Sequence, residues 1–518
     1  MMERKWWTLV AACVATFMLL LDITVVNVAL PDIQRDLDAS LSSLQWVVDA
    51  YALTLAAFLL TTGSLGDRLG RRRVFAIGFG VFTVASLGCG IAGDPTLLNL
   101  ARALQGVGAA AMFATSLALI AQEFEPAERA TAIGAWGATV GGAVAVGPLI
   151  GGLLTEGFGW EWIFFVNVPI GIGAIVLTVT KLANVKATDA QPIDWLGLGT
   201  FSAALFLLIF GLIRGNPEGW SSVPIVGSLV GAGALLVAFL AVELRQDHAM
   251  LDLSLFRKPA FSGVSIVALA LSAGMFAMFL YLTLYIQDVL GFSPLEAGLR
   301  FLPVTLLSFL VAPIAGKLSG RIPVRILLGV GLVLVGVGLL LMRGIELDDS
   351  WTTLLPGFLL AGVGIGLVNP GIASTAIGVV EPLRAGMASG INSTFRQVGI
   401  ATGVAALGAI FQSRIEARLG ELLPGAPSSL AEAVSAGGGR AAAEAAPPGS
   451  RAQIAEAANE AFVSGLNDIL LVGAAIAIAG GVIGFALVRS RDFVQQPGTD
   501  AAAEPSIPPR AATREAEG

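Results

Sequence analysis

Charged residues are scarce in this chain. Only 13% of its 518 residues are Asp, Glu, Lys or Arg, whereas a soluble domain carries about a quarter. Hydrophobic residues make up 55% of the sequence. We therefore predict that most of the chain lies in a lipid bilayer. No long basic tract is present, so the sequence offers no binding surface for nucleic acid.

Metal-binding and nucleophilic residues are almost as scarce. The two cysteines, Cys13 and Cys89, fall inside apolar runs, where we interpret them as small core residues rather than as a disulfide or metal ligands. The single histidine, His248, lies in a charged link. The sequence shows no nucleophile–base cluster and no G-x-x-x-x-G-K-[ST] motif. These absences predict a protein without metal or cofactor that is neither an enzyme nor a self-contained ATP-driven pump.

Long apolar runs are abundant. A helix needs about 20 residues to cross the hydrocarbon core. The first run is too long for a signal peptide, so we interpret it as a retained membrane helix. The fourteen predicted spans are Trp7–Leu30, Leu44–Thr62, Val74–Gly93, Thr96–Gln122, Ala130–Thr155, Trp162–Thr180, Trp195–Ile213, Val223–Val242, Phe261–Tyr285, Leu295–Ala315, Ile326–Met342, Trp351–Gly371, Ala385–Phe411 and Leu466–Val488.

The link Gly63–Arg73 sets the orientation of these spans. It holds four arginines between two apolar runs, and short cytoplasmic loops retain positive charge during insertion. If this link is cytoplasmic, alternate links are cytoplasmic too, and most of the other Lys and Arg residues fall in them. The sequence thus predicts a multi-pass protein with both termini in the cytoplasm.

The spans group as six, two and six. Residues 7–181 form a first bundle, residues 195–242 two inserted helices, and residues 260–488 a second bundle. We expect an outer loop at residues 412–464, whose alanine-rich stretches could form short surface helices, and a disordered cytoplasmic tail at residues 489–518. Similar short links follow the second span of each bundle, which indicates duplicated halves around a central cavity.

Gly63–Arg73 contains more than charge. Gly63 and Gly70 permit a tight turn and close helix approach. Asp67 and Arg71 are four residues apart and can pair across one helical turn. A loop that only retains positive charge would need the arginines, Arg68 among them, but not these glycines and this aspartate.

At this point the sequence resembles a known family. G-x-L-x-D-R-x-G-R-R after the second helix is the signature of the major facilitator superfamily. Asn99–Gly108 resembles the fourth-helix motif of this superfamily, and Gly141–Gly152 resembles the fifth-helix motif of its exporters. Four further motifs resemble the 14-helix drug:proton antiporters of the QacA/EmrB type: Leu21–Pro31, Gln45–Tyr51, Trp162–Gly171 and Leu290–Pro294.

The resemblance implies an all-α major facilitator fold, with two six-helix bundles and two extra central helices. It also implies a monomer in the inner membrane of a bacterium. Gly63, Asp67, Arg68, Gly70 and Arg71 would form a conformational latch. The segment Gly141–Gly152 would be an antiporter hinge, built on close packing of small residues and a kink at proline. Its hinge residues are Gly147, Pro148, Gly151 and Gly152.

Charges within the spans are the candidate functional residues. A charge at the bilayer centre costs about 2.5–3.5 kcal/mol on insertion scales. At ~1.5 Å per residue, Asp22, Asp49 and Arg102 all lie about 8–9 Å below the outer surface. We expect them to form one layer in which Asp22 or Asp49 accepts a proton from outside. The alternatives are a static ion pair and, for Asp49, a helix end that faces water.

Four further residues are candidates for the cavity: Tyr51, Gln105, Asn392 and Arg396. Arg396 and Asn392 could equally cap a hydrogen-bond network between helices. The last six spans hold no clearly mid-membrane carboxylate. By resemblance, this favours monovalent or neutral lipophilic substrates over divalent cations.

The sequence therefore predicts an exporter of lipophilic or cationic drugs that works by proton antiport, with the lipid bilayer, a small lipophilic substrate and protons as its partners. Two alternatives stay open. One is a dedicated exporter of an antibiotic or lipid made by the cell itself. The other is a membrane receptor that binds its ligand without transport.

Overall fold

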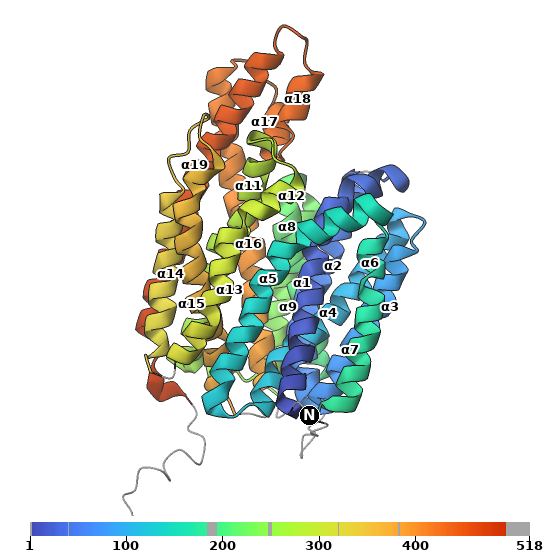
Figure 1. Ribbon diagram of the computed structural model, residues 1–518, viewed down its shortest axis with the longest axis vertical. Helices are drawn as coiled ribbons and strands as arrows, with labels where there is room; N and C mark the ends of the chain where they lie inside the picture. The colour runs from blue at the N-terminus through green and yellow to red at the C-terminus, as the bar shows by residue number, and fades with distance from the viewer. Residues whose placement is uncertain are drawn as a thin grey trace, which may run out of the picture.

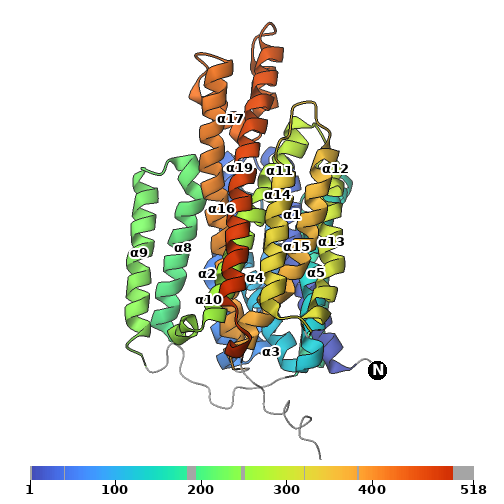
Figure 2. The same cartoon turned by 90° about the vertical axis from the view of Figure 1, so that its left-hand side faces the viewer.

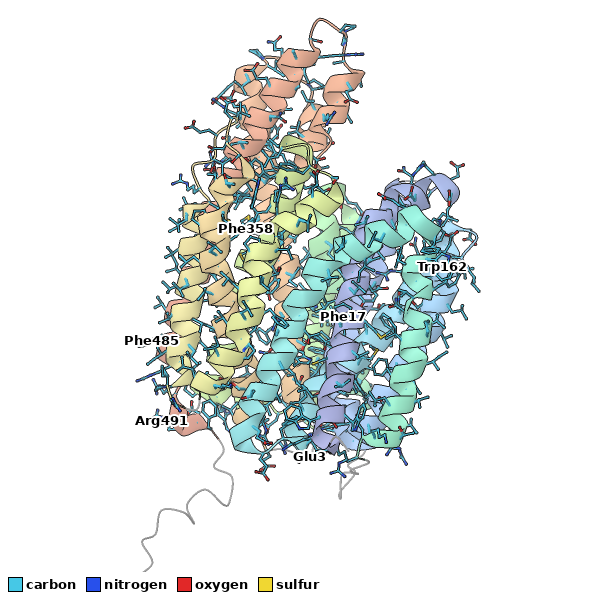
Figure 3. All side chains as sticks on the ribbon, viewed as in Figure 1. Glu3, Phe17, Trp162, Phe358, Phe485 and Arg491 are labelled. Carbon is cyan, nitrogen blue, oxygen red and sulfur yellow. The ribbon has the colours of Figure 1, made fainter. Side chains whose placement is uncertain are left out.

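The computed structural model describes residues 3–39, 41–183, 194–246, 251–319, 321–381 and 384–493. Across these ranges the chain consists of helices joined by turns, with no strand. The helices run along the long axis of the molecule (Figure 1). We call the end that carries Glu3 and Arg491 the proximal end, and the opposite end the distal end (Figure 3).

The first bundle contains seven helical elements. Asp94 caps one of them, because its carboxylate accepts the N–H groups of Thr96 and Leu97 at 2.9 Å each, and Pro95 follows directly. The elements are α1 (Arg4–Asp36), α2 (Leu41–Leu69), α3 (Arg71–Gly90), α4 (Pro95–Glu123), α5 (Pro126–Phe158), α6 (Trp162–Phe165) and α7 (Asn167–Lys181).

The second bundle begins after a short 3₁₀ turn, η1 (Leu253–Arg257). Its first span changes from α to π geometry twice, and such π segments are frequent at functional sites. The elements are α10 (Pro259–Leu271), η2 (Ser272–Phe276), α11 (Ala277–Leu284), η3 (Tyr285–Val289), α12 (Pro294–Arg300), α13 (Leu302–Leu318), α14 (Val324–Leu341), η4 (Trp351–Leu354), α15 (Leu355–Gly378), α16 (Ala385–Leu422) and α19 (Arg451–Leu487).

Two inserted helices, α8 (Trp195–Glu218) and α9 (Val223–Glu243), form an antiparallel hairpin beside the bundles (Figure 2). Helix α8 packs against α2 of the first bundle and α16 of the second. Helix α9 leaves Val223, Val230 and Val237 67–85% exposed. Such a valine surface is suited to lipid, where exposed apolar side chains carry no cost.

The helices coincide with the predicted spans. Each of the fourteen predicted segments falls on helical structure, and four of them cover more than one helical element. Twelve helices in the described ranges are long and apolar enough to cross a membrane, and shorter apolar helices lie at Leu149–Phe158 and Leu302–Leu318. These two belong to the predicted spans that start at Ala130 and Leu295. The expected all-helical membrane fold is therefore confirmed.

Links predicted to share one side of the membrane do meet at one end of the molecule. At the proximal end Lys5 forms an ion pair with Glu128 at 2.8 Å. Arg72 donates to the carbonyl oxygen of Leu182 at 3.1 Å, and Lys258 to that of Val379 at 2.7 Å. The basic links are thus tied to one another, although their cytoplasmic location stays a prediction.

Residues 412–464, predicted as an outer loop, are largely helical. Helix α16 continues to Leu422 and α19 already starts at Arg451, so both project beyond the bundle at the distal end (Figure 1). Between them lie α17 (Ser428–Ser435) and α18 (Gly439–Ala445). Ion pairs, such as Arg414 with Asp468 at 3.0 Å, join the two long helices. Alanine-rich sequence with paired charges thus extends the spans as helices into water.

The predicted tail lies mostly outside the described residues. Its described part contains the short 3₁₀ turn η6 (Ser490–Asp492). The carboxylate of Asp492 accepts the N–H of Ala260 at 3.0 Å and so attaches this turn to the start of α10.

Candidate functional site

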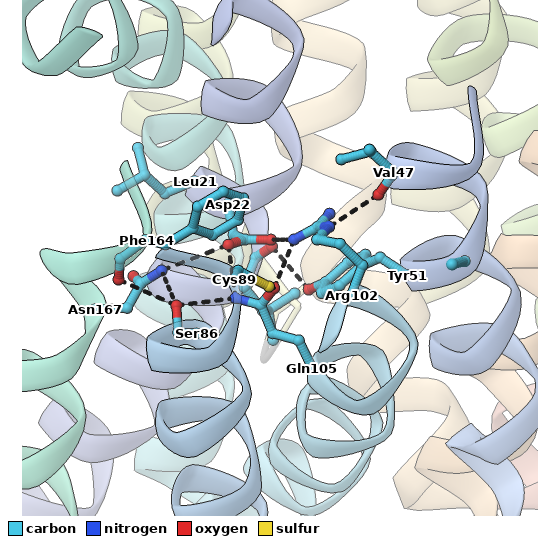
Figure 4. Close-up of polar contacts among 12 residues, drawn as sticks. Leu21, Asp22, Val47, Tyr51, Ser86, Cys89, Arg102, Gln105, Phe164 and Asn167 are labelled. Atoms are coloured by element: carbon cyan, nitrogen blue, oxygen red, sulfur yellow. Dashed lines mark hydrogen bonds and ion pairs between the residues drawn. The ribbon is translucent and has the colours of Figure 1, made fainter. Parts of the chain in front are cut away.

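Asp22 lies at the centre of a buried polar network in the first bundle (Figure 4). Its carboxylate forms an ion pair with Arg102 of α4. Gln105, one turn further along α4, donates to Asp22 Oδ1 at 2.8 Å, and Asn167 of α7 donates to the same oxygen at 3.4 Å. A single carboxylate on α1 therefore holds α4 and α7 together.

Arg102 has several partners in this network. Its Nη1 donates to Gln105 Oε1 at 2.6 Å as well as to Asp22, and its Nε donates to the Val47 carbonyl at 2.9 Å. The guanidinium carbon lies 4.4 Å from the centre of the Tyr51 ring, a distance suited to a cation–π contact. Four kinds of partner thus compensate for burial of the charge.

A second tier of polar residues supports the first. Ser86 of α3 accepts from Gln105 at 3.1 Å and from Asn167 at 3.0 Å, and donates to the Phe164 carbonyl at 3.1 Å. Sequence reasoning did not single out Ser86 or Asn167. Asn167 belongs to the Trp162–Gly171 motif. A polar amide in an apolar span is the sequence feature that could have identified it as a functional residue.

A glycine brings α4 close enough to α2 for these contacts. A Cβ on Gly106 would lie 2.5 Å from the Tyr51 carbonyl oxygen. Beside it, Thr54 donates to the Ala103 carbonyl oxygen at 2.8 Å. The glycine of the Asn99–Gly108 motif therefore has a packing function, since it allows Arg102 to reach α2.

Asp49 does not join this network, although the sequence predicts it at a similar depth. Its carboxylate lies 3.7 Å from Arg214 of the inserted helix α8. Arg214 also pairs with Glu218 at 2.8 Å and lies 5.6 Å from the centre of the Trp46 ring. Two carboxylates therefore share one arginine, in a group that links the first bundle to the hairpin.

The predicted latch joins the two bundles at the proximal end. Asp67 pairs with Arg71 at 2.9 Å, as expected from their spacing. Its carboxylate also accepts the backbone N–H groups of Gly386 at 3.1 Å and Met387 at 2.8 Å, in the first turn of α16. An aspartate of the first bundle thus caps a helix of the second, where the helix dipole favours negative charge.

Glycines allow this contact. Gly70 has a φ of 100°, which L-residues with side chains rarely adopt, and it separates α2 from α3. A Cβ on Gly63 would lie 2.5 Å from the Gly386 carbonyl oxygen. Arg68, the remaining latch residue, interacts electrostatically with Asp194 and Glu243 at the proximal ends of α8 and α9.

A second ion pair lies beside the latch. Asp252, which precedes η1, pairs with Arg384 at 2.5 Å, and Arg384 precedes α16. Burial raises the pKa of the Asp252 carboxyl. Hydrogen bonds from Ser254 and the charge of Arg384 lower this pKa by a larger amount, so it lies below its usual value. This carboxylate therefore stays ionised near neutral pH.

The predicted hinge residues differ in their packing. A Cβ on Gly147 would lie 1.8 Å from Thr24 Oγ1, and one on Gly151 would lie 3.3 Å from the Val25 Cα, so both glycines face α1. Gly152 has nothing within 4 Å. Helix α5 is continuous through Pro148. Close packing of α5 on α1 is therefore evident, and bending at Pro148 stays a prediction.

The four candidate cavity residues fall into two groups. Tyr51 donates to the Leu19 carbonyl at 3.1 Å and, with Gln105, belongs to the Asp22 network. Arg396 donates to Asn369 Oδ1 at 3.0 Å, and Asn369 lines a cavity of about 20 Å³. Asn392 is buried one turn earlier on α16.

No group of three or more potential metal ligands occurs in the described part of the chain. The site consists instead of a buried carboxylate paired with a buried guanidinium. If Asp22 accepts a proton, Arg102 loses its counter-ion inside a buried network, and the packing of α1, α4 and α7 has to change.

Two helical bundles with buried, paired charges between their spans define a polytopic membrane transporter. The chain belongs to the Major Facilitator Superfamily, which its residues 12–404 match. The family assignment from the sequence motifs is thereby confirmed at the level of the superfamily, whose members are transporters rather than enzymes.

Curated relatives are resistance and export proteins of bacteria. The tetracenomycin C resistance and export protein of Streptomyces glaucescens is 33% identical over 93% of this chain and 91% of that protein. The multidrug resistance protein Stp of Mycobacterium tuberculosis is 37% identical over 80% of this chain and 77% of Stp. The probable actinorhodin transporter of Streptomyces coelicolor is 38% identical over 79% and 72%, respectively.

A solved structure supports the fold. The crystal structure of the human organic anion transporter MFSD10 (TETRAN) matches with a TM-score of 0.59 over 92% of this chain and 100% of that chain. The two sequences are 15% identical, so this likeness concerns the fold alone.

Proposed function

We propose that this protein exports lipophilic compounds from the cell in exchange for protons, as a member of the 14-helix drug:proton antiporters. The observation that carries the proposal is the buried Asp22 network. Burial of an ionisable carboxylate in a membrane bundle is costly, and residues of this kind are usually functional. Relatives named for multidrug resistance and antibiotic export support it.

The proton site in this proposal is Asp22. Its charge is coupled to three helices at once, α1, α4 and α7, whereas Asp49 contacts a single arginine of the hairpin. A proton can drive transport only if its binding changes the relative stability of two conformations. The carboxylate with the most contacts between helices is best placed for that.

Alternating access would proceed by separation of the two halves. The latch of Asp67 on α16 and the close approach of α5 to α13 hold the proximal ends together. In our proposal the proximal side is the cytoplasmic side of a bacterial inner membrane, with both termini there. The protein would work as a monomer, since each chain contains both halves.

The proposal is tested in inside-out vesicles with an acidic lumen. Uptake is measured for ethidium, a lipophilic cation, and for pyrenebutyrate, a lipophilic anion. We expect uptake of at least one dye that stops when the pH gradient is collapsed. Uptake that is independent of the gradient would contradict proton antiport, and uptake of neither dye, with both bound, would favour a receptor.

A narrower function is the second candidate. Two relatives carry the names of single antibiotics, tetracenomycin C and actinorhodin, which favours a dedicated exporter. A panel of unrelated lipophilic compounds separates the two functions. Gradient-driven export of one compound and none of the others would establish the dedicated exporter.

A further inference from the structure

A small cavity lies where the two halves face each other. Val140 of α5 forms its wall on the side of the first bundle. The second bundle contributes Phe276 of η2, Phe279 of α11, Thr305 and Ser308 of α13, and Asn369 of α15. Its volume is about 20 Å³, enough for about one water molecule, so a substrate can enter only when the halves separate.

Arg396 of α16 lies beside this cavity without a carboxylate partner. Its Nη2 donates to Asn369 Oδ1 at 3.0 Å, and its guanidinium carbon lies 5.7 Å from the centre of the Phe276 ring. Both of these neighbours line the cavity. Within the described ranges no Asp or Glu comes within 4.0 Å of Arg396, so its charge is solvated by one amide and one ring.

A second donor lies one turn away on the same helix. Asn392 is 4% exposed, and its Nδ2 has no hydrogen-bond acceptor in the described part of the chain. Residues four apart share one face of a helix, so Asn392 and Arg396 lie on the same face of α16. A buried donor without an acceptor is rare in native proteins and calls for a ligand or water.

We propose that Arg396 and Asn392 bind the acidic group of the transported compound. The ligand class is a lipophilic aromatic acid, whose carboxylate pairs with the guanidinium and whose rings lie against Phe276 and Phe279. A planar guanidinium matches a carboxylate with two parallel hydrogen bonds. This inference rests on the proposed export function and names its substrate class, of opposite charge to the cationic drugs expected from the sequence.

The test compares three probes with one aromatic body: pyrenebutyrate, its methyl ester, and a pyrenebutyl trimethylammonium ion. Binding to the purified full chain is followed by pyrene fluorescence, without any pH gradient. We expect the acid to bind more tightly than the ester. Arg396→Gln should weaken binding of the acid by about 10- to 100-fold, the effect of losing a charged hydrogen bond, and change the ester by less than about twofold.

Further variants separate charge from packing. Arg396→Lys keeps the charge but not the planar fork, and should retain part of the preference for the acid. Asn392→Ala should weaken binding of the acid by a smaller factor, about 3- to 10-fold, as expected for loss of a neutral hydrogen-bond donor. Arg300→Gln is the matched control. Arg300 also stacks on an aromatic ring, 3.3 Å from the centre of Phe292, but lies in α12 outside this cavity, so binding of all three probes should be unchanged.

Equal affinity of the wild-type chain for acid and ester would overturn the proposal. Equal weakening of both by Arg396→Gln would also overturn it, because the arginine would then act through packing. A different outcome would refute the export function alone: the acid binds selectively, but none of the three probes is transported. Gradient-driven transport without preference for the acid would leave export intact and refute the acidic substrate class alone.

Discussion

The two halves of the molecule differ in how they surround the arginines of their spans. In the first half Arg102 has a carboxylate, a side-chain amide, a carbonyl and an aromatic ring around it. In the second half Arg396 has one amide and one ring, and borders a cavity. One positive charge is neutralised by the protein itself, and the other is left for a ligand.

Under the proposed function, this difference gives the halves separate tasks. A proton on Asp22 would remove the counter-ion of Arg102. A charge without a counter-ion responds to an anion that arrives from outside. The comparison thus suggests coupling in the first bundle and recognition in the second, and the following variants test that division.

The largest effect is expected for Asp22→Asn. The asparagine leaves Arg102 buried without its carboxylate, and breaking a buried pair in this way costs about 3–5 kcal/mol. We expect a marked fall in the thermal unfolding temperature of the purified protein. Gradient-driven transport in vesicles should be lost.

A double variant separates stability from coupling. Asp22→Asn combined with Arg102→Gln removes both charges, and replacement of a whole buried pair is often nearly neutral for stability. The unfolding temperature should recover while gradient-driven transport stays lost. If transport recovers as well, the pair is a structural tie and the proton binds elsewhere.

The sequence predicted the Asp22–Arg102 pair for a physical reason. Both residues are charges in apolar spans, and counting ~1.5 Å per residue places them at one depth. Depth is a local property of a span, as is the apolar length from which the fourteen spans were predicted. Direction around the helix axis is not, and Asp49, at a similar depth, faces the inserted hairpin instead.

Other features depended on contacts that no local pattern encodes. Asp67 caps α16 through Gly386 and Met387, which follow it in the sequence by 319 and 320 positions. Ser86 and Asn167 lie in apolar spans and gain importance only from their place beside Asp22. Tyr51 and Gln105, predicted for the cavity, form hydrogen bonds in the network around Arg102 and its neighbours, and their place in a transport cavity stays a prediction.

Gly147→Ala should have the next largest effect. Its new methyl group would lie 1.8 Å from Thr24 Oγ1, and overpacking of this kind costs about 1–3 kcal/mol. Unfolding temperature and transport rate should both fall. Gly152→Ala is the matched control, with nothing within 4 Å, and should leave both unchanged or slightly raised. Failure of Thr24→Ala to relieve the Gly147→Ala defect would argue against a clash with α1.

Asp67→Asn should have a moderate effect on turnover. Asparagine can still accept one of the two α16 N–H groups, but it loses the second acceptor and the charge that pairs with Arg71 and favours the N-terminus of α16, an effect of about 1–2 kcal/mol. That amount shifts the balance between closed and open proximal ends by about 5- to 30-fold. Transport should slow while the dissociation constant of the substrate stays the same. A weaker affinity at unchanged turnover would move Asp67 from the latch to the substrate site.

The smallest effect is expected for Asp49→Asn. Its carboxylate is 14% exposed and lies 3.7 Å from Arg214, beyond hydrogen-bonding distance, and Glu218 remains to pair with that arginine. We expect a loss of about 1 kcal/mol or less in stability and transport that still follows the pH gradient, at a rate reduced by less than about tenfold. The measurement is made in the same vesicles as for Asp22→Asn. If Asp49→Asn abolishes coupling at unchanged stability while the Asp22 variants keep it, the proton site belongs at the junction with the hairpin. The inserted helix α8, through Arg214, would then take part in coupling.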